Sequence, residues 1–218
     1  AKIESPHPRV SIFNFHYCVP PVVVAMNYGL ARVIGENETG FRGRDDLLYR
    51  TEAWDFLLAG GALFNNLDYS FTPAHPGGTF FEYKSPGGGS ADLRKQLGIL
   101  KRFLDSFDFV RMKPDASLVQ SVSPTLTHYA LVEPGKAYAI YLHVPLPKKP
   151  EKLDSYRRAD VSATVRLQLP QGAYRVQWIN TKTGVLDADE SFEHAGGSRS
   201  ISSPLFTDDI ALRIVAAG

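Results

Sequence analysis

Cysteine is almost absent from this sequence. Cys18 is the single cysteine among 218 residues, so no disulfide can form within the chain. Spacings that hold metals, such as C-x-x-C or H-E-x-x-H, are also missing. The sequence therefore predicts neither a disulfide framework nor a bound metal or other cofactor, and cysteine usage leaves the cellular compartment open.

An excess of charge of one sign is missing too. The chain has 24 Lys and Arg against 23 Asp and Glu, a formal net charge of +1, and its basic residues are scattered. A nucleic acid backbone attracts concentrated positive charge, so nucleic acid is not expected as a partner. No apolar run approaches the roughly 20 residues that span a bilayer. The opening AKIESPHPRV lacks the features of a signal peptide, so we expect no membrane partner and an export signal that lies upstream or has been removed.

What the sequence does contain is the composition of a globular protein, with 44% apolar and 22% charged residues. In the first half, β-branched and aromatic runs alternate with stretches of helical period. Asp45 is placed to cap one helix and Gly60-Gly61 to end it. Trp54 falls on the apolar stripe of that helix and is expected in the core. The predicted strands are Val10–Tyr17, Arg32–Gly35 and Ala62–Phe71, and the predicted helices are Val22–Leu30, Arg44–Gly60 and a segment capped by Ser90. Such alternation predicts parallel strands with crossover helices.

The second half has a different texture after about Pro114. Short β-rich runs such as THYALVE and AYAIYLHV are separated by turn signals, and no amphipathic helix interrupts them. This pattern predicts an antiparallel β-sandwich with Trp178 in its core and a hairpin turn over Asn180–Gly184. Further turns are expected at Gln171-Gly172 and Gly196-Gly197. The predicted fold class is α/β plus all-β, with domains over residues 1–113 and 114–218.

Each predicted parallel strand ends in polar and aromatic residues, FNFHY, IGENETG and NNLDYSF. The carboxyl ends of parallel strands carry the chemistry in α/β folds. A long Gly- and Pro-rich loop, Thr72–Gly89, follows the third strand, and loops of that length are often functional or mobile. Its aromatic residues Phe80, Phe81 and Tyr83 fit either a platform for a sugar ring or an anchor for the loop.

At this point the chain resembles the C-terminal half of a clan A glycoside hydrolase, a (β/α)8 barrel. It is most similar to cellulase-like proteins with a trailing β-sandwich that is described in some of them as a collagen-binding domain. The resemblance rests on His16-Tyr17, which look like the end of the sixth barrel strand, on Ile34-Gly35-Glu36 at the end of the seventh, and on YRVQWINTKTGV in the sandwich. On this alignment the last three βα units of a partial barrel precede the sandwich.

The resemblance implies hydrolysis of an O-glycosyl bond by paired carboxylates, about 5 to 5.5 Å apart in retaining enzymes and farther apart in inverting ones. Glu36 and Glu38 are the candidate catalytic residues. If the strand continues through both, they share a face. Alignment with the apolar run favours Glu36 as nucleophile, whereas Glu38 precedes a Thr-Gly as some family nucleophiles do, and both can also be solvated loop carboxylates. Arg42, with Arg44 close behind, suggests a paired carboxylate cluster.

Other polar residues near the strand ends are candidates for binding a carbohydrate substrate. His16 and Tyr17 are placed to contact a sugar hydroxyl or to orient the nucleophile, although a strand-end histidine can be satisfied by backbone alone. Asp68 can contact a sugar hydroxyl or can cap the end of its strand. His75 can bind substrate or can serve only to hold the loop. The predicted substrate-binding residues are His16, Tyr17, Asn37, Arg42, Asp68, Tyr69 and His75.

The family's acid/base glutamate has no counterpart in this sequence. The resemblance therefore implies that an N-terminal half of the same protein, or else another chain, supplies that glutamate and the first five strands. It also implies a secreted or periplasmic location. A non-catalytic carbohydrate-binding or structural protein on a degenerate barrel is the competing hypothesis, and a standalone three-stranded α/β protein is disfavoured because its sheet faces would be uncovered.

Overall fold

The computed structural model describes residues 1–84 and 87–217, so residues 85 and 86 of the predicted loop and the terminal Gly218 lie outside the described residues. The chain separates into two compact units, Ala1–Gly98 and Ile99–Gly218. The division falls inside a helix, and the domain limits predicted from the sequence, 1–113 and 114–218, stay a prediction. Each unit is described by itself.

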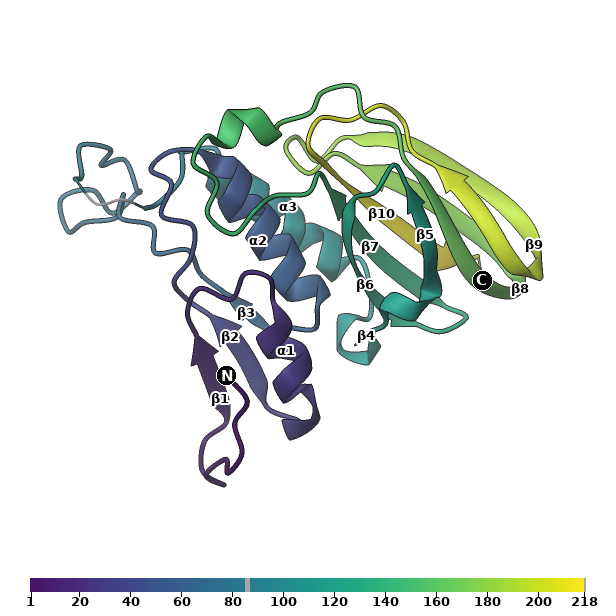
Figure 1. Ribbon diagram of the computed structural model, residues 1–218, viewed down its shortest axis with the longest axis horizontal. Coiled ribbons are helices and arrows are strands. Elements are labelled where there is room, and N and C mark those ends of the chain that lie inside the picture. Colours follow the sequence, from purple (N-terminus) through teal and green to yellow (C-terminus); the bar gives the residue numbers. More distant parts are fainter. Residues whose placement is uncertain (85–86, 218) are drawn as a thin grey trace. The chain divides into compact units, whose positions relative to one another are not determined.

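Unit 1 contains a small parallel sheet of three strands in the order β1-β2-β3 (Figure 1). Their bounds are β1 Ile12–Phe15, β2 Val33–Glu36 and β3 Leu63–Phe64. The parallel direction predicted from the alternating pattern is confirmed. The third strand is much shorter than predicted, because the Asn65 side chain accepts a hydrogen bond from the Leu67 N–H and Leu67 adopts a φ of 52°, which turns the backbone out of the extended conformation.

Three α-helices begin in the described part of unit 1, and side-chain hydrogen bonds precede two of them, α2 and α3. The bounds are α1 Val22–Asn27, followed by a 3₁₀ turn over Tyr28–Leu30, and α2 Asp46–Leu58, while α3 Leu93–Asp105 crosses into unit 2. Asp45 caps α2 as predicted, since its carboxylate accepts from the Leu47 N–H at 3.0 Å. Gly60, with a φ of 101°, follows the end of α2. Ser90 accepts from the Asp92 N–H just ahead of α3.

One face of the parallel sheet is packed and the other is exposed. Ile34 packs with Val23 and Val24 of α1 and with Phe56 of α2. On the opposite face, the register places Ile12 beside Val33, and Leu63 beside Gly35. These three apolar side chains are exposed, Ile12 at 50%, Val33 at 37% and Leu63 at 37%. Among the described residues, this face of the sheet carries apolar side chains without a packed layer over it.

Unit 2 is an antiparallel sheet of seven strands that curls on itself (Figure 1). The strands are β4 Lys113–Pro114, β5 Val119–Ser123, β6 Thr127–Glu133, β7 Ala137–His143, β8 Thr164–Ile179, β9 Leu186–Ser202 and β10 Asp209–Ala216. Their order is β4-β6-β7-β10-β8-β5, with β9 also paired to β8. Short 3₁₀ helices span Phe109–Arg111, Ala116–Leu118 and Leu153–Tyr156. The antiparallel, all-β character predicted for this region is confirmed.

Two predicted turns of unit 2 are wrong. β8 runs through Gln171-Gly172 and β9 runs through Gly196-Gly197, because the two strands pair along nearly their whole length. Gly196 and Gly197 have φ values of 93° and 99°, a backbone conformation that glycine adopts readily, and the register with β8 continues unchanged across them. The predicted turn over Asn180–Gly184 is confirmed, with the Gly184 N–H donating to the Asn180 carbonyl at 2.8 Å.

The core of unit 2 is built from alternate residues of its strands. The inward side chains of β7, β8 and β10 form one apolar cluster, which includes Ile140, Val176, Trp178 and Leu212. Trp178 is buried there as predicted, and Trp54 is buried in unit 1. Both tryptophans are therefore core residues.

Candidate active site

The candidate site lies where β1 and β2 of unit 1 end side by side. The parallel pairing continues past the last strand residues, since the Asn37 N–H donates to the Phe15 carbonyl at 3.2 Å and the Tyr17 N–H donates to the Glu38 carbonyl at 3.0 Å. Tyr17 has a φ of 59°, in the left-handed region that few non-glycine residues adopt. This local backbone brings the side chains of His16 and Tyr17 to Glu38.

Both carboxylate oxygens of Glu38 have partners on the neighbouring strand end. The Tyr17 hydroxyl donates to Oε1 at 2.7 Å, and His16 Nδ1 lies 2.5 Å from Oε2. The Glu38 side chain is 24% exposed and that of His16 is 48% exposed, so solvent reaches the group. The hydrogen bond to Glu38, with burial and the Glu38 charge, raises the pKa of Tyr17 and keeps the phenol protonated as a donor.

Glu36 stands in a different environment. Its side chain has no exposed surface, and its Oε1 accepts from the Cys18 N–H at 2.6 Å. β2 itself ends at Glu36, although backbone hydrogen bonds to the end of β1 continue through Asn37 and Glu38. The condition for a shared face, a strand that continues through both glutamates, is therefore not met by β2, because Glu38 belongs to the segment after the strand.

A third glutamate, Glu52 of α2, also lies in this region, and it was not identified from the sequence as a site residue. It is buried, and Thr39, the residue after Glu38, donates a hydrogen bond from its hydroxyl to Glu52 Oε2. Burial raises the pKa of Glu52 to about 8, and the negative charges of Glu36 and Asp55 act in the same direction. One signal in the sequence could have indicated a buried glutamate. The charged residues of α2, DLLYRTEAWDFLL, are spread around the helix and do not gather on one solvent-facing side.

The two arginines that follow the glutamates have other contacts. The Arg42 N–H donates to the Tyr49 hydroxyl at 2.8 Å, and the Arg44 guanidinium donates to the Phe81 carbonyl and lies 5.0 Å from the centre of the Phe81 ring. In the part of the chain that the structure describes, no ion pair joins Arg42 or Arg44 to Glu36 or Glu38. The predicted arginine–carboxylate cluster is therefore not formed.

The remaining predicted residues fall into two groups. Asn37 directly precedes Glu38, and Tyr69 is 39% exposed and close enough to Tyr17 to raise its pKa. Asp68 and His75 have partners within their own turns, and Asp68 also pairs with Arg94, whose Nη1 lies 3.8 Å from Asp68 Oδ2. Asp68 accepts from the Ser70 N–H at 2.9 Å and from its hydroxyl, while His75 Nδ1 lies 3.2 Å from the Thr79 hydroxyl.

Aromatic side chains flank Glu38 and its partners. The rings of Tyr17 and Phe41 lie 5.7 Å apart, and those of Tyr69 and Tyr83 lie 6.1 Å apart.

Within residues 1–84 and 87–217 there is no group of three or more His, Cys, Asp or Glu side chains that could hold a metal ion. The same described residues contain no helix long and apolar enough to cross a membrane.

No protein-family model matches the chain, and no curated protein sequence matches it. Solved structures do. One is described as a glycoside hydrolase, with a TM-score of 0.60, 14% identity and coverage of 92% of this chain and 46% of its own. Another is a glycoside hydrolase family 5 protein from Bacteroides vulgatus ATCC 8482, also with a TM-score of 0.60 and 14% identity, covering 92% of this chain and 45% of its own. The chain thus spans less than half the length of these structures, and it has the fold of that part of a glycoside hydrolase.

Proposed function

We propose that this chain is the C-terminal half of a glycoside hydrolase and supplies one of its two catalytic carboxylates, Glu38. The observation that carries the proposal is the pair of contacts on Glu38, in which Tyr17 and His16 hold both carboxylate oxygens at the carboxyl ends of adjacent parallel strands. In this proposal β1, β2 and β3 are the last three strands of a (β/α)8 barrel, and residues 114–218 form an accessory β-sandwich.

The exposed face of the parallel sheet supports the barrel. Ile12, Val33 and Leu63 present apolar side chains on this face, and parallel sheets are almost always covered on both faces. In a closed barrel the same side chains point inward and pack in layers. We therefore propose that an N-terminal half of the same protein supplies the remaining strands and the proton-donating glutamate, and that the protein is exported.

Glu38 is a better nucleophile candidate than Glu36 because only Glu38 is reachable. In the proposed step a Glu38 oxygen forms a bond to the anomeric carbon while the glycosidic C–O bond breaks. The leaving oxygen takes a proton from the acid of the N-terminal half, and water later cleaves the glycosyl ester. Tyr17 and His16 orient the carboxylate, since donors to the charged form favour it and restrict its rotation.

The other residues near Glu38 receive supporting roles. Asn37 and Tyr69 are proposed to contact substrate, together with the Phe41 ring, because pyranose rings offer C–H faces to aromatic side chains. For Arg42 we propose a contact between its backbone and the substrate, and no contact of its side chain. The hydrogen bond from the Arg42 N–H to the Tyr49 hydroxyl holds that backbone in place. Asp68 and His75 are proposed to shape the loop after β3, since both bond to residues of their own turns and Asp68 also pairs with Arg94.

The test uses the full-length protein with its N-terminal half and a panel of activated aryl glycosides. Glu38→Gln should lower kcat by orders of magnitude, whereas Glu82→Gln, an exposed loop glutamate, should leave it unchanged. A 2-deoxy-2-fluoroglycoside with a good leaving group should label Glu38, which mass spectrometry locates within the tryptic peptide Val33–Arg42.

Each other result has a clear meaning. A label on Glu36 would move the nucleophile to that residue and contradict the assignment made here. Hydrolysis without labelling, lost in Glu38→Gln, would make Glu38 the base of an inverting enzyme. Sugar binding without hydrolysis of any substrate would support a binding protein on a degenerate barrel instead.

A further inference from the structure

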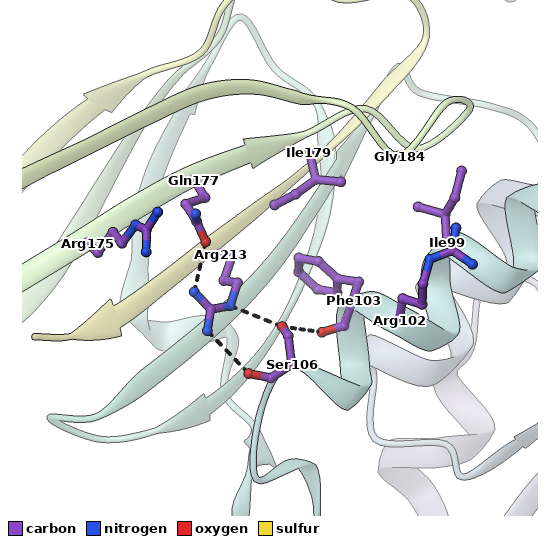
Figure 2. A pocket seen from close by; sticks show the side chains of 9 residues that line it. All are labelled: Ile99, Arg102, Phe103, Ser106, Arg175, Gln177, Ile179, Gly184 and Arg213. Atoms are coloured by element: carbon purple, nitrogen blue, oxygen red, sulfur yellow. Dashed lines mark hydrogen bonds between the residues drawn. The ribbon is translucent and has the colours of Figure 1, made fainter.

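Unit 2 contains a cavity of about 410 Å³ between the second half of α3 and the strands β8 and β10 (Figure 2). Ile99 and Phe103 of α3 and Ile179 of β8 give it an apolar lining. Three guanidinium groups also line it, those of Arg102, Arg175 and Arg213. Figure 2 shows that these arginines come from three different elements, so the fold, and not a local charge run, gathers them.

Arg213 is held in place by neutral groups. It donates to the Ser106 hydroxyl at 3.0 Å, to the Ser106 carbonyl at 3.2 Å and to Gln177 Oε1 at 2.8 Å. The Ser106 carbonyl follows the C-terminus of α3, where a cation is favourable. Burial, together with the charge of Arg175, lowers the pKa of Arg213. The Arg213 guanidinium is therefore held in position by three neutral acceptors, and none of these acceptors carries a negative charge.

The other two arginines differ in their partners. Arg175 forms a bidentate pair with Asp189, at 2.9 and 2.6 Å, and Asp189 also accepts from Gln177. Arg102 stands in the last turn of α3 and forms no ion pair among the described residues. The described residues that line the cavity include no carboxylate. Of the three arginines only Arg175 has an ion-pair partner among the described residues, so the lining carries an excess of positive charge.

We propose that this cavity binds a sugar that carries a carboxylate, a hexuronate unit of an acidic saccharide. A carboxylate accepts two parallel hydrogen bonds from a guanidinium, and the pyranose ring has an apolar face that packs on Phe103 and its aliphatic neighbours. The volume lies within the range of about 300 to 1,000 Å³ that ligand pockets occupy. The choice of a sugar rests on the proposed function, whereas the choice of an anion rests on the three arginines alone.

The test is a titration of the whole chain with digalacturonate, cellobiose and inorganic sulfate, followed by calorimetry and by the NMR signals of arginine Nε–H groups. Digalacturonate should bind and shift the signals of Arg102 and Arg213, and cellobiose should not. Arg102→Gln should weaken binding about ten-fold or more, since a charge-assisted hydrogen bond is lost. Arg111→Gln is the matched control, because Arg111 is an exposed arginine of unit 2 that pairs with Asp108 away from the cavity lining.

Equal binding of cellobiose, or an equal loss in both arginine variants, would overturn the proposal. Sulfate binding as tight as that of digalacturonate would overturn its sugar part by showing a plain anion site. Binding is measured without hydrolysis, so a protein that takes up digalacturonate here but cleaves no glycoside would refute only the proposed function. A hydrolase that leaves the cavity empty would refute only this inference.

Discussion

The two units bury different kinds of side chain. Unit 2 closes around a large apolar cluster drawn from its strands, which includes the buried side chains of Ile140 and Trp178. Unit 1 contains most of the buried polar and charged residues among those described. They are Asn27, Glu36, Thr39, Arg50, Thr51, Glu52, Asp55, Asn66, Ser70 and Gln96. Buried polar groups are costly unless they are paired, so unit 1 depends on specific contacts where unit 2 depends on apolar packing.

This difference in buried side chains matches the location of the candidate site, which lies in unit 1. Two of the buried polar residues of unit 1, Thr39 and Glu52, are hydrogen-bonded to each other next to Glu38, and one face of the sheet is exposed. Perturbed titratable groups collect at functional sites more often than in ordinary cores, and Glu52 is such a group. Trp54 and Trp178 allow each unit to be followed separately by fluorescence, if the other tryptophan is replaced by Phe.

The largest expected effect is in the core of unit 2. Ile140→Ala should lower the free energy of unfolding by about 2 to 5 kcal/mol, because it removes buried methyl groups and leaves a cavity. Urea titration followed by Trp178 fluorescence measures the loss. Val110→Ala, at an exposed position of the same unit, is the control and should stay within about 0.5 kcal/mol of the parent. Similar losses in both variants would show that the cluster is not the source of stability.

The next effect is a pH dependence confined to unit 1. The folded pKa of Glu52 is about 8 against an ordinary value of 4.5, so the unfolded chain releases this proton first as the pH rises. The free energy of unfolding should fall between pH 4.5 and about pH 8 and then level off. The total change is on the order of a few kcal/mol.

The pH dependence is measured by urea titration followed by Trp54 fluorescence at several pH values. Glu52→Gln removes the titrating group while it keeps an acceptor for the Thr39 hydroxyl, so the slope should disappear. The Trp178 signal of unit 2 provides the comparison. A slope that survives in Glu52→Gln would assign it to another group.

A smaller effect is expected at the start of α2. Asp45→Ala removes the acceptor of the Leu47 N–H and should lower the free energy of unfolding by about 1 kcal/mol. Asp45→Asn keeps a side-chain oxygen at the same place and should recover most of the loss. Trp54, which lies on the same helix, reports the transition. Equal losses in both variants would show that the carboxylate charge matters more than the cap.

The smallest effect is expected on the exposed sheet face. Val33→Ala should change the stability of this chain by less than about 0.5 kcal/mol, since the side chain is not covered. In the full-length protein the same change should cost on the order of 1 kcal/mol, if further strands cover this face. Thermal unfolding of both proteins makes the comparison. The same small change in each would argue against the closed barrel.

Several parts of the fold were predictable because their causes are local. The cap at Asp45, the helix end near Gly60 and the turn over Asn180–Gly184 depend on residues a few positions apart. The β3 strand was predicted too long because the left-handed backbone of Leu67 is not encoded in the apolar pattern. β8 was divided in two because a Gly-containing pair normally indicates a turn.

The candidate site was predictable only in part. His16, Tyr17 and the two glutamates were identified at strand ends, but the sequence could not choose between Glu36 and Glu38. The distinction depends on burial, since Glu36 faces the interior beside Cys18 whereas Glu38 remains open to solvent. Glu52 was missed because its pKa depends on charges from β2 and on desolvation, neither of which can be read from the residues next to it.

The sequence by itself determined the alternation of strands and helices, the change to an all-β region and the capping residues, because periodicity and backbone preference act over a few neighbouring residues. The tertiary structure decided which carboxylate is reachable, which is buried, and that three arginines from separate elements share one cavity. Burial, ion pairing and electrostatic potential depend on distances between residues far apart in the chain, and only the folded chain sets those distances.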